Sequence, residues 1–429
     1  KGPAVTKRVR PLLCLIAFLL SCLPSFAQGT EIMFQAFTWN GEAGGPGNWY
    51  AKLKEVAPEV SELGATHIWF PPPSRSLAKQ GYLPLDYYDV GSHHSPTFYG
   101  HYDSLKAAVG AYNELGIKTI ADVVVNHRCA NKQQDGQWNV YHYPSNKAVW
   151  ERWALARGDY GGTGANDTGD DYGAAPDIDH TNEQVRKDII EWLKWLRDDI
   201  GFRGWRLDFA KGYGPSYAQI YSKSTDSAFT VAEVWTSMDY DGSSLKPNQN
   251  GHRQYLCNYL DGANGLVSAF DFTTKGILQV ACARGEYWRL QDSEGRPSGL
   301  IGWWPSKAVT LIDNHDTGSA QNHWPFPGHQ VAAGYAYILT HPGTPSIFWD
   351  HYFQWGPEMK EQIKHLASLR HEQGIRSSSR VKILRAEQSM YLAIIDDKTM
   401  VKLGPAHYSP DSSWTHRLSG KDYQVWLLK

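Results

Sequence analysis

Eight short apolar runs, separated by segments of helical length, are the feature that most restricts the fold of this chain of 429 residues. The runs cover residues 32–37, 67–70, 118–125, 204–208, 229–233, 268–272, 308–312 and 346–349. Helical periodicity fills some of the intervals, over residues 49–63, 104–115 and 182–199. Eight strands that alternate with helices predict a closed (β/α)8 TIM barrel, in the α/β class, rather than an open sheet.

Two stretches depart from this alternation. Residues 128–180 are polar and rich in Gly, Asp and aromatic residues, and a long segment without periodicity is typical of a functional insertion. From residue 376 onward, short alternating runs predict a small antiparallel β domain. We therefore expect a barrel formed by residues 28–127 and 181–375, an irregular insertion at 128–180 after the third strand, and a C-terminal domain at 376–429.

The first 27 residues have the pattern of a secretory signal peptide. Basic residues within positions 7–10 precede a short apolar run at 12–20, and small residues end at Ala27. We expect cleavage after Ala27 and secretion to an extracellular or periplasmic location. A lipoprotein anchor at Cys22 is the alternative. The apolar run is too short for a stable membrane span, and no later stretch predicts one.

Composition narrows the classes of ligand. A formal net charge of −2 provides no basic surface for nucleic acid. The chain has 18 Trp and 24 Tyr, and aromatic faces pack well on sugar rings, although an aromatic-rich core is the alternative interpretation. Cysteines 129, 257 and 282 remain after the leader and match no zinc spacing, so they form one disulfide or stay free. A monomer is the default expectation.

Polar residues gather where the predicted strands end. The fourth run ends at Asp208 and the fifth at Glu233, while the third leads into 126–127 (Asn-His) and the seventh into 313–316 (Asp-Asn-His-Asp). Parallel strands open at the same face of a barrel, where active sites lie. A carboxylate pair at that face is the equipment for cleaving a glycosidic bond.

Taken together and in this order, these blocks resemble the signature regions of the α-amylase family, glycoside hydrolase family 13. The chain is most similar to plant-type α-amylases, through residues 33–37 (MFQAF), 71–74 (PPPS), 204–212 (GWRLDFAKG), 301–305 (IGWWP) and 340–345 (THPGTP). The resemblance implies a secreted, retaining, endo-acting hydrolase of α-1,4-glucans such as starch, glycogen and maltooligosaccharides. The alternatives are a transglycosylating relative and a catalytically idle glucan-binding protein on the same barrel.

The resemblance assigns roles to three carboxylates, all of which are present. Asp208 would be the nucleophile, and Arg206, which points to the same side of the strand, would keep it ionised. Glu233 would be the general acid and base, with burial and neighbouring carboxylates favouring its protonated form. Asp316 would stabilise the transition state.

Further residues would contact the sugars. Those implied near the reacting sugar are Tyr82, His127, Arg206 and His315, and those on the other side of the cleaved bond are Lys211 and Trp235. Trp303 and Trp304 are a candidate platform for starch granules outside the active site, with a buried pair as the alternative. Tyr391 is a second candidate sugar contact, in the C-terminal domain.

A structural calcium ion is also implied. Its expected ligands are the side chains of Asn126, Asp167 and Asp177 and the main-chain carbonyls of Asp170 and Gly212. Calcium prefers six to eight oxygen ligands, which this set begins to supply. Because Gly212 follows the Asp208 strand, the ion would tie the insertion to that strand. A solvated acidic loop is the alternative, and the sequence leaves open whether more than one ion binds.

Overall fold

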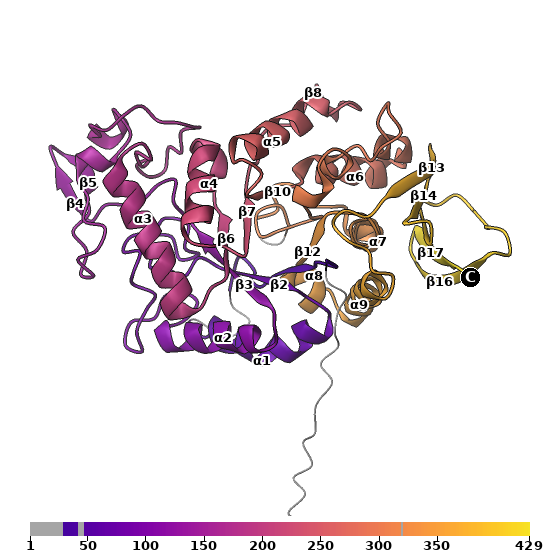
Figure 1. Ribbon diagram of the computed structural model, residues 1–429, viewed down its shortest axis with the longest axis horizontal. Helices are drawn as coiled ribbons and strands as arrows, with labels where there is room; N and C mark the ends of the chain where they lie inside the picture. The colour runs from indigo at the N-terminus through magenta and orange to yellow at the C-terminus, as the bar shows by residue number, and fades with distance from the viewer. Residues whose placement is uncertain (1–28, 42–46, 319–320) are drawn as a thin grey trace, which may run out of the picture.

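The computed structural model describes residues 29–41, 47–318 and 321–429, so the expected signal peptide, its cleavage site and Cys22 lie outside the described residues. Eight parallel strands close a barrel in the order β1-β12-β11-β10-β7-β6-β3-β2, which confirms the predicted fold class (Figure 1). These strands are β1 (Met33–Gln35), β2 (His67–Phe70), β3 (Lys118–Val123), β6 (Gly204–Leu207), β7 (Phe229–Ala232), β10 (Ser268–Phe270), β11 (Ala308–Thr310) and β12 (Thr344–Phe348).

Helices separate the barrel strands along the chain. They are α1 (Trp49–Glu62), α2 (Tyr102–Glu114), α3 (Glu183–Trp195), α4 (Pro215–Ser224), α5 (Asn250–Gly262), α6 (Phe272–Arg284), α7 (Val331–Thr340), α8 (Trp349–Phe353) and α9 (Pro357–Glu372). In α1, Leu53, Val56 and Val60 are buried at the spacing that places side chains on one face of a helix. That apolar face attaches α1 to the rest of the fold, whereas α7 is buried on all sides.

Several element boundaries differ from the sequence prediction, among them the ends of β10, of β12 and of the helix expected at 182–199. The sixth strand ends at Phe270 rather than at Phe272, because the side chain of Asp271 accepts a hydrogen bond from the Thr274 N–H and begins α6. The eighth strand ends at Phe348, and α8 follows directly. The expected helix at 182–199 ends as an α-helix at Trp195 and continues as a π-helical turn (Leu196–Ile200). A polar cap therefore decides the end of β10, whereas α8 begins after β12 without a side-chain cap.

The insertion after β3 contains a small hairpin, β4 (Lys132–Gln134) and β5 (Gln137–Val140). Arg128 anchors it, since this fully buried guanidinium donates to the carbonyls of Leu85 (2.7 Å) and Ala148 (2.8 Å). The rings of Tyr87 and Trp150 lie 4.5 and 4.8 Å from the same group. These contacts fix the insertion against the barrel.

The C-terminal domain is one antiparallel sheet in the order β13-β14-β15-β17-β16. Its strands are β13 (Val381–Glu387), β14 (Met390–Ile395), β15 (Thr399–Leu403), β16 (Trp414–Gly420) and β17 (Tyr423–Leu428). The sheet and the β4–β5 hairpin lie at opposite sides of the barrel (Figure 1). Tyr391 is fully buried and its hydroxyl lies 2.8 Å from Nε2 of His341, so its predicted role as a sugar contact is wrong.

Two smaller features complete the fold. A further short pair, β8 (Tyr240–Asp241) and β9 (Ser244–Leu245), follows β7. Cys129, Cys257 and Cys282 are free thiols, as the unbridged alternative expected. Among the described residues, no helix combines the length and apolarity needed to cross a membrane.

Buried histidines predict how stability depends on pH. Burial lowers the pKa of both His67 and His341 to about 3, so the folded protein keeps them neutral. As pH falls below about 6.5, these histidines become protonated in the unfolded chain but stay neutral in the folded protein. The free energy of unfolding therefore falls until about pH 3.

We expect His341→Gln to remove about 1.4 kcal/mol of the stability loss between about pH 7.5 and about pH 5.5. Urea unfolding of the wild type and the variant at both pH values measures this difference. An unchanged pH dependence in the variant would contradict the assignment of a neutral, buried His341.

Candidate active site

One buried guanidinium organises the carboxyl end of the barrel. Arg206, on β6, has no exposed side-chain surface. Its Nη1 lies 3.0 Å from Asp122 Oδ1 and 2.6 Å from Asp208 Oδ1, and its Nη2 lies 2.7 Å from Glu233 Oε1. The structure therefore brings both sequence-predicted carboxylates, Asp208 and Glu233, to a single cation.

The strand register explains this convergence. Asp122 on β3 pairs with Arg206 on β6, and Leu207 pairs with Ala232 on β7, so the residues directly after β6 and β7 leave the barrel side by side. The backbone then turns sharply at Phe209, whose φ of 43° lies in the left-handed region. That turn aims the Phe209 N–H at Glu233 Oε2, 3.0 Å away.

One positive charge is surrounded by three carboxyl groups, and two of them, Asp122 and Asp208, have raised pKa values. Burial raises the pKa of Asp122 to about 6, against the opposing effect of Arg206. Burial also raises the pKa of Asp208 well above its ordinary value, again opposed by Arg206. Arg206 acts on Asp208 in the predicted direction, since it lowers the pKa of that carboxyl, but burial has the larger effect. Burial and like charges outweigh the cation, so the cluster can retain a proton.

Asp122 is a member of the site to which sequence reasoning assigned no role. Its Oδ2 accepts hydrogen bonds from Trp69 Nε1 (3.1 Å) and from the Tyr82 hydroxyl (2.8 Å). Through Asp122, the position of Tyr82 is therefore linked to that of Arg206. The available signal was that Asp122 is an acidic residue inside an otherwise apolar strand.

The loop after β11 supplies a second polar group. His315 is almost fully buried, and its Nδ1 accepts a hydrogen bond from Gln35 Nε2 (3.0 Å) while its Nε2 lies 3.3 Å from Asp316 Oδ2. Burial holds the pKa of His315 well below its usual range, so the ring is neutral. Gln321 donates to Asp316 Oδ1 at 2.9 Å, and the ring of Tyr82 is parallel to that of His315 at 5.2 Å. Sequence reasoning missed both glutamines.

His127 contacts Tyr82 and Tyr172. Its Nε2–H donates to the carbonyl of Tyr82 (2.9 Å), and its ring stacks on Tyr172 with centroids 3.6 Å apart. Burial lowers its pKa to about 4, so this ring is also neutral. These contacts hold His127 in place, and its predicted hydrogen bond to a sugar stays a prediction.

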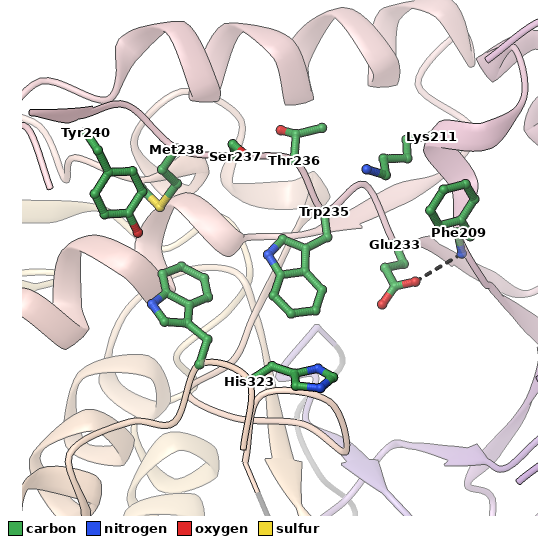
Figure 2. Close-up of a pocket in the computed structure, with 10 residues that line it drawn as sticks. Phe209, Lys211, Glu233, Trp235, Thr236, Ser237, Met238, Tyr240 and His323 are labelled. Atoms are coloured by element: carbon green, nitrogen blue, oxygen red, sulfur yellow. Dashed lines mark hydrogen bonds between the residues drawn. The ribbon is translucent and has the colours of Figure 1, made fainter. Parts of the chain in front are cut away.

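A cavity of about 570 Å³ opens beside Glu233. It is lined by Phe209, Lys211, Glu233, Trp235, Thr236, Ser237, Met238, Tyr240, His323 and Trp324. Figure 2 shows Glu233, Trp235 and His323 around one common space. The Trp235 ring is nearly parallel to that of Trp324, with centroids 6.4 Å apart. The sequence-predicted pair Lys211 and Trp235 is therefore at the site, and His323 and Trp324 were missed.

The insertion contains a crowded group of carboxylates. Ligand atoms of Asp159, Asp171 and Asp177 lie within 4.8 Å of one another. Burial and then the neighbouring carboxylates raise the pKa of Asp177 to about 8, and burial also raises that of Asp167. Such crowding without a nearby positive charge is electrostatically unfavourable, and a bound cation would relieve it. Sequence reasoning did not include Asp159 or Asp171 among the ligands.

Asn126 joins this group from the end of β3. Its Nδ2 donates to Asp177 Oδ1 (2.8 Å), while its buried Oδ1 has no hydrogen-bond partner among the described residues. Gly212 lies against this oxygen, because a Cβ added there would come within 2.2 Å of it. The Asp170 N–H donates to the carbonyl of Lys211 (3.0 Å), which brings the expected ligand segments together. An orphaned acceptor among carboxylates fits a cation that takes oxygen ligands.

The two adjacent tryptophans lie elsewhere. Trp303 and Trp304 are both half-buried in the loop between two 3-10 turns, Leu300–Gly302 and Pro305–Lys307. The guanidinium of Arg253 lies 4.0 Å from the Trp303 ring. Neither tryptophan lines the cavity beside Glu233. Their role as a granule platform stays a prediction.

Comparison with known proteins identifies relatives along the chain. Residues 55–240 match the family model "Alpha amylase, catalytic domain", and residues 372–427 match "Alpha-amylase C-terminal beta-sheet domain". "Probable alpha-amylase 2" of Arabidopsis thaliana is 43% identical over 93% of this chain and 94% of its own length. "Alpha-amylase 3, chloroplastic" of the same plant is 44% identical over 93% of this chain, but the match spans only 44% of that relative.

Solved structures share the fold at low sequence identity. CldA, a cyclomaltodextrin glucanotransferase, superposes with a TM-score of 0.66 at 16% identity, over 88% of this chain and 87% of its own. At this identity the similarity establishes the architecture only.

Removing the central cation tests the electrostatic description. We expect Arg206→Met to lower the free energy of unfolding by about 3–5 kcal/mol, because three carboxyl groups then share a buried site without a counter-charge. The loss should be larger near pH 8 than near pH 5.5, since protonation at the lower pH relieves the repulsion. Urea unfolding at both pH values measures it. Arg380→Met, which breaks an exposed ion pair with Asp397, is the matched control and should change stability little.

Proposed function

The chain belongs to the α-amylase family of glycoside hydrolases, and from that membership we propose that it cleaves internal α-1,4 bonds of starch-like glucans with retention of configuration. One observation carries the proposal. Asp208 and Glu233, on neighbouring strands, contact the same guanidinium, and Glu233 lines an aromatic cavity at the carboxyl end of the barrel. Retaining enzymes need two carboxyl groups about 5–5.5 Å apart, and a shared guanidinium keeps such a pair close.

The chemistry proceeds in two displacements. Asp208 attacks the anomeric carbon while Glu233 gives its proton to the glycosidic oxygen, so the C–O bond breaks and a glycosyl ester forms on Asp208. Glu233, now ionised, takes a proton from water, and the resulting nucleophile displaces Asp208 by attacking the opposite face of the sugar, the face that the first leaving group occupied. The first step requires one carboxyl of the cluster protonated and another ionised. Three carboxyls around one cation favour such a mixture, because the single positive charge cannot balance three negative charges.

Neighbouring groups assist the reacting sugar. We assign Asp316 to the sugar hydroxyls and the developing positive charge, with neutral His315 as its close neighbour. Tyr82, held by Asp122, offers its ring face as a platform beneath the sugar. On the other side of the cleaved bond, Lys211 and Trp235 would hold the leaving portion of the chain.

Transfer to a second sugar is the second candidate function. The parallel rings of Trp235 and Trp324 favour it, because an aromatic-lined cavity can hold an acceptor sugar where hydrolysis needs only water. The distinction rests on which acceptor reaches the glycosyl ester first.

We also propose that the insertion holds at least one structural calcium ion. Asn126, Asp167 and Asp177 would supply side-chain oxygens, and the carbonyls of Asp170 and Gly212 would add main-chain oxygens. Asp159 and Asp171, which lie with Asp177, extend this set. When bound, the ion would neutralise the carboxylates and join the insertion to the segment that follows Asp208.

Secretion through the N-terminal segment remains part of the proposal. It is supported by the basic, apolar and small-residue pattern that ends at Ala27. The mass of the protein recovered from the culture medium would test cleavage there. A monomer remains the default proposal for the oligomeric state.

The nucleophile provides the most direct test of function. We expect Asp208→Asn to lower the release of reducing sugar from soluble starch by about 10⁴-fold, because the amide cannot form the glycosyl ester. Asp397→Asn, in the exposed ion pair of the C-terminal domain, is the matched control and should keep full activity.

Two outcomes would contradict parts of the proposal. Starch binding by the wild type without new reducing ends would favour transfer or an idle binder. A first product of β configuration, seen by proton NMR before mutarotation, would exclude the retaining mechanism.

Chelation tests the ion. We expect calcium at about a hundredfold excess over its Kd to stabilise the wild type by about 2.7 kcal/mol relative to the chelated protein. Asp177→Asn should lose most of this gain, yet be at least as stable as the wild type under chelation, since it relieves carboxylate crowding. Asp170→Asn, which keeps the carbonyl, should retain the gain. Thermal unfolding with calcium or with a chelator measures all three, and equal gains in all would contradict the site.

A further inference from the structure

A buried lysine behind the active site has an unusual set of partners. Lys275, on α6, has no exposed side-chain surface. Its Nζ donates to the carbonyls of Ile312 (2.7 Å) and Trp324 (2.9 Å), to Gln279 Oε1 (2.8 Å) and to Asp313 Oδ1 (3.3 Å). Four acceptors thus surround an ammonium group that has three hydrogens.

Three of these partners bracket one functional segment. Ile312 and Asp313 precede His315 and Asp316, while Trp324 follows them and lines the cavity beside Glu233. One ammonium therefore holds the described stretches 312–318 and 321–326 together. The fourth partner, Gln279, belongs to α6 itself and is not part of the segment.

Asp313 also helps to hold the stretches 312–318 and 321–326 together. Its Oδ1 accepts from the Thr317 hydroxyl (2.9 Å), and both carboxylate oxygens lie 3.2 Å from the N–H of Phe326. His351 Nε2 lies 3.5 Å from Oδ2 on the opposite side. The Lys275–Asp313 pair therefore contacts the segment at its beginning, at Thr317 and at its end.

The position of Asp316 depends on these contacts between the two stretches. Its carboxylate has few partners of its own: Gln321 at 2.9 Å and His315 at 3.3 Å, both from the same segment. Nothing in this short list ties Asp316 to Glu233 or Arg206 directly. The backbone of the segment must therefore set the distance between Asp316 and the other carboxylates.

Burial of the Lys275–Asp313 pair is not an efficient way to stabilise the fold. A buried ion pair is often no more stabilising than apolar residues of the same shape, because both charges lose their hydration. Burial lowers the pKa of Lys275 to about 8 against the opposing effect of Asp313, so the ammonium is still charged at neutral pH. A fold that needed only packing behind α6 would be served equally well by a methionine.

We propose that Lys275 is a positioning residue for glucan cleavage, which holds the stretches 312–318 and 321–326 together and thereby places Asp316 and Trp324 opposite Glu233. The inference rests on the proposed hydrolase function. It concerns the transition state in particular, because Asp316 is assigned to the charge that develops there. Loss of the contacts that Lys275 makes with these stretches should lower kcat far more than it changes KM.

The test compares three variants with the wild type on soluble starch. Lys275→Met removes the ammonium and leaves Asp313 as an uncompensated buried charge. Lys275→Met with Asp313→Asn removes both charges at nearly constant shape, so its urea midpoint should recover toward that of the wild type. Gln279→Met is the matched control, because it deletes one hydrogen bond of Lys275 that does not reach the segment.

Positioning predicts that kcat and stability separate. We expect the double variant to fold with near wild-type stability but to keep a kcat about 100-fold below the wild type, with KM changed by less than about threefold. Gln279→Met should keep wild-type kcat. The double variant decides the question even where Lys275→Met alone does not fold.

A purely structural role predicts the opposite pattern. Recovery of kcat together with stability in the double variant would overturn the proposal, as would wild-type kcat in folded Lys275→Met. Inactivity of the wild type itself would refute the proposed hydrolase function instead, so the two failures are distinguishable.

Discussion

The contact of Arg206 with three carboxyl groups is the interaction on which the rest of the site depends. A guanidinium presents several donors in a fixed plane, so it can hold Asp122, Asp208 and Glu233 from three neighbouring strands at once. An ammonium in the same place would offer no such geometry. The barrel register supplies the positions, and the cation makes the close approach of like charges tolerable.

The acidic group of the insertion lies close to the Arg206 cluster along the chain, because residues 208–212 take part in both. Asp208 ends the catalytic strand, Phe209 turns the backbone, and Gly212 lies against the orphaned oxygen of Asn126. Occupation of the acidic group in the insertion would therefore act on the segment that carries the nucleophile. The insertion is in this sense a support for the active site.

Much of the architecture could be predicted from sequence because it depends on local patterns. The eight strands alternate with helices at regular intervals, and acidic or imidazole side chains end several of them. Parallel strands in a barrel all open at one face, so Asp208 and Glu233 had to be neighbours once the fold was recognised. The errors were confined to element ends, such as Phe272, where a single capping contact decides between strand and helix.

What the tertiary structure alone decided are the contacts between residues distant in sequence. The partners of Asp122, Gln35 and Lys275 come from other strands and loops, so no local pattern identifies those partners. The same reason explains the buried Tyr391, whose hydroxyl meets His341 across a domain boundary. By itself the sequence determined which chemistry is present and at which end of the barrel it lies. Packing determined which side chains hold that chemistry in place, since burial and charge balance are properties of the assembled fold.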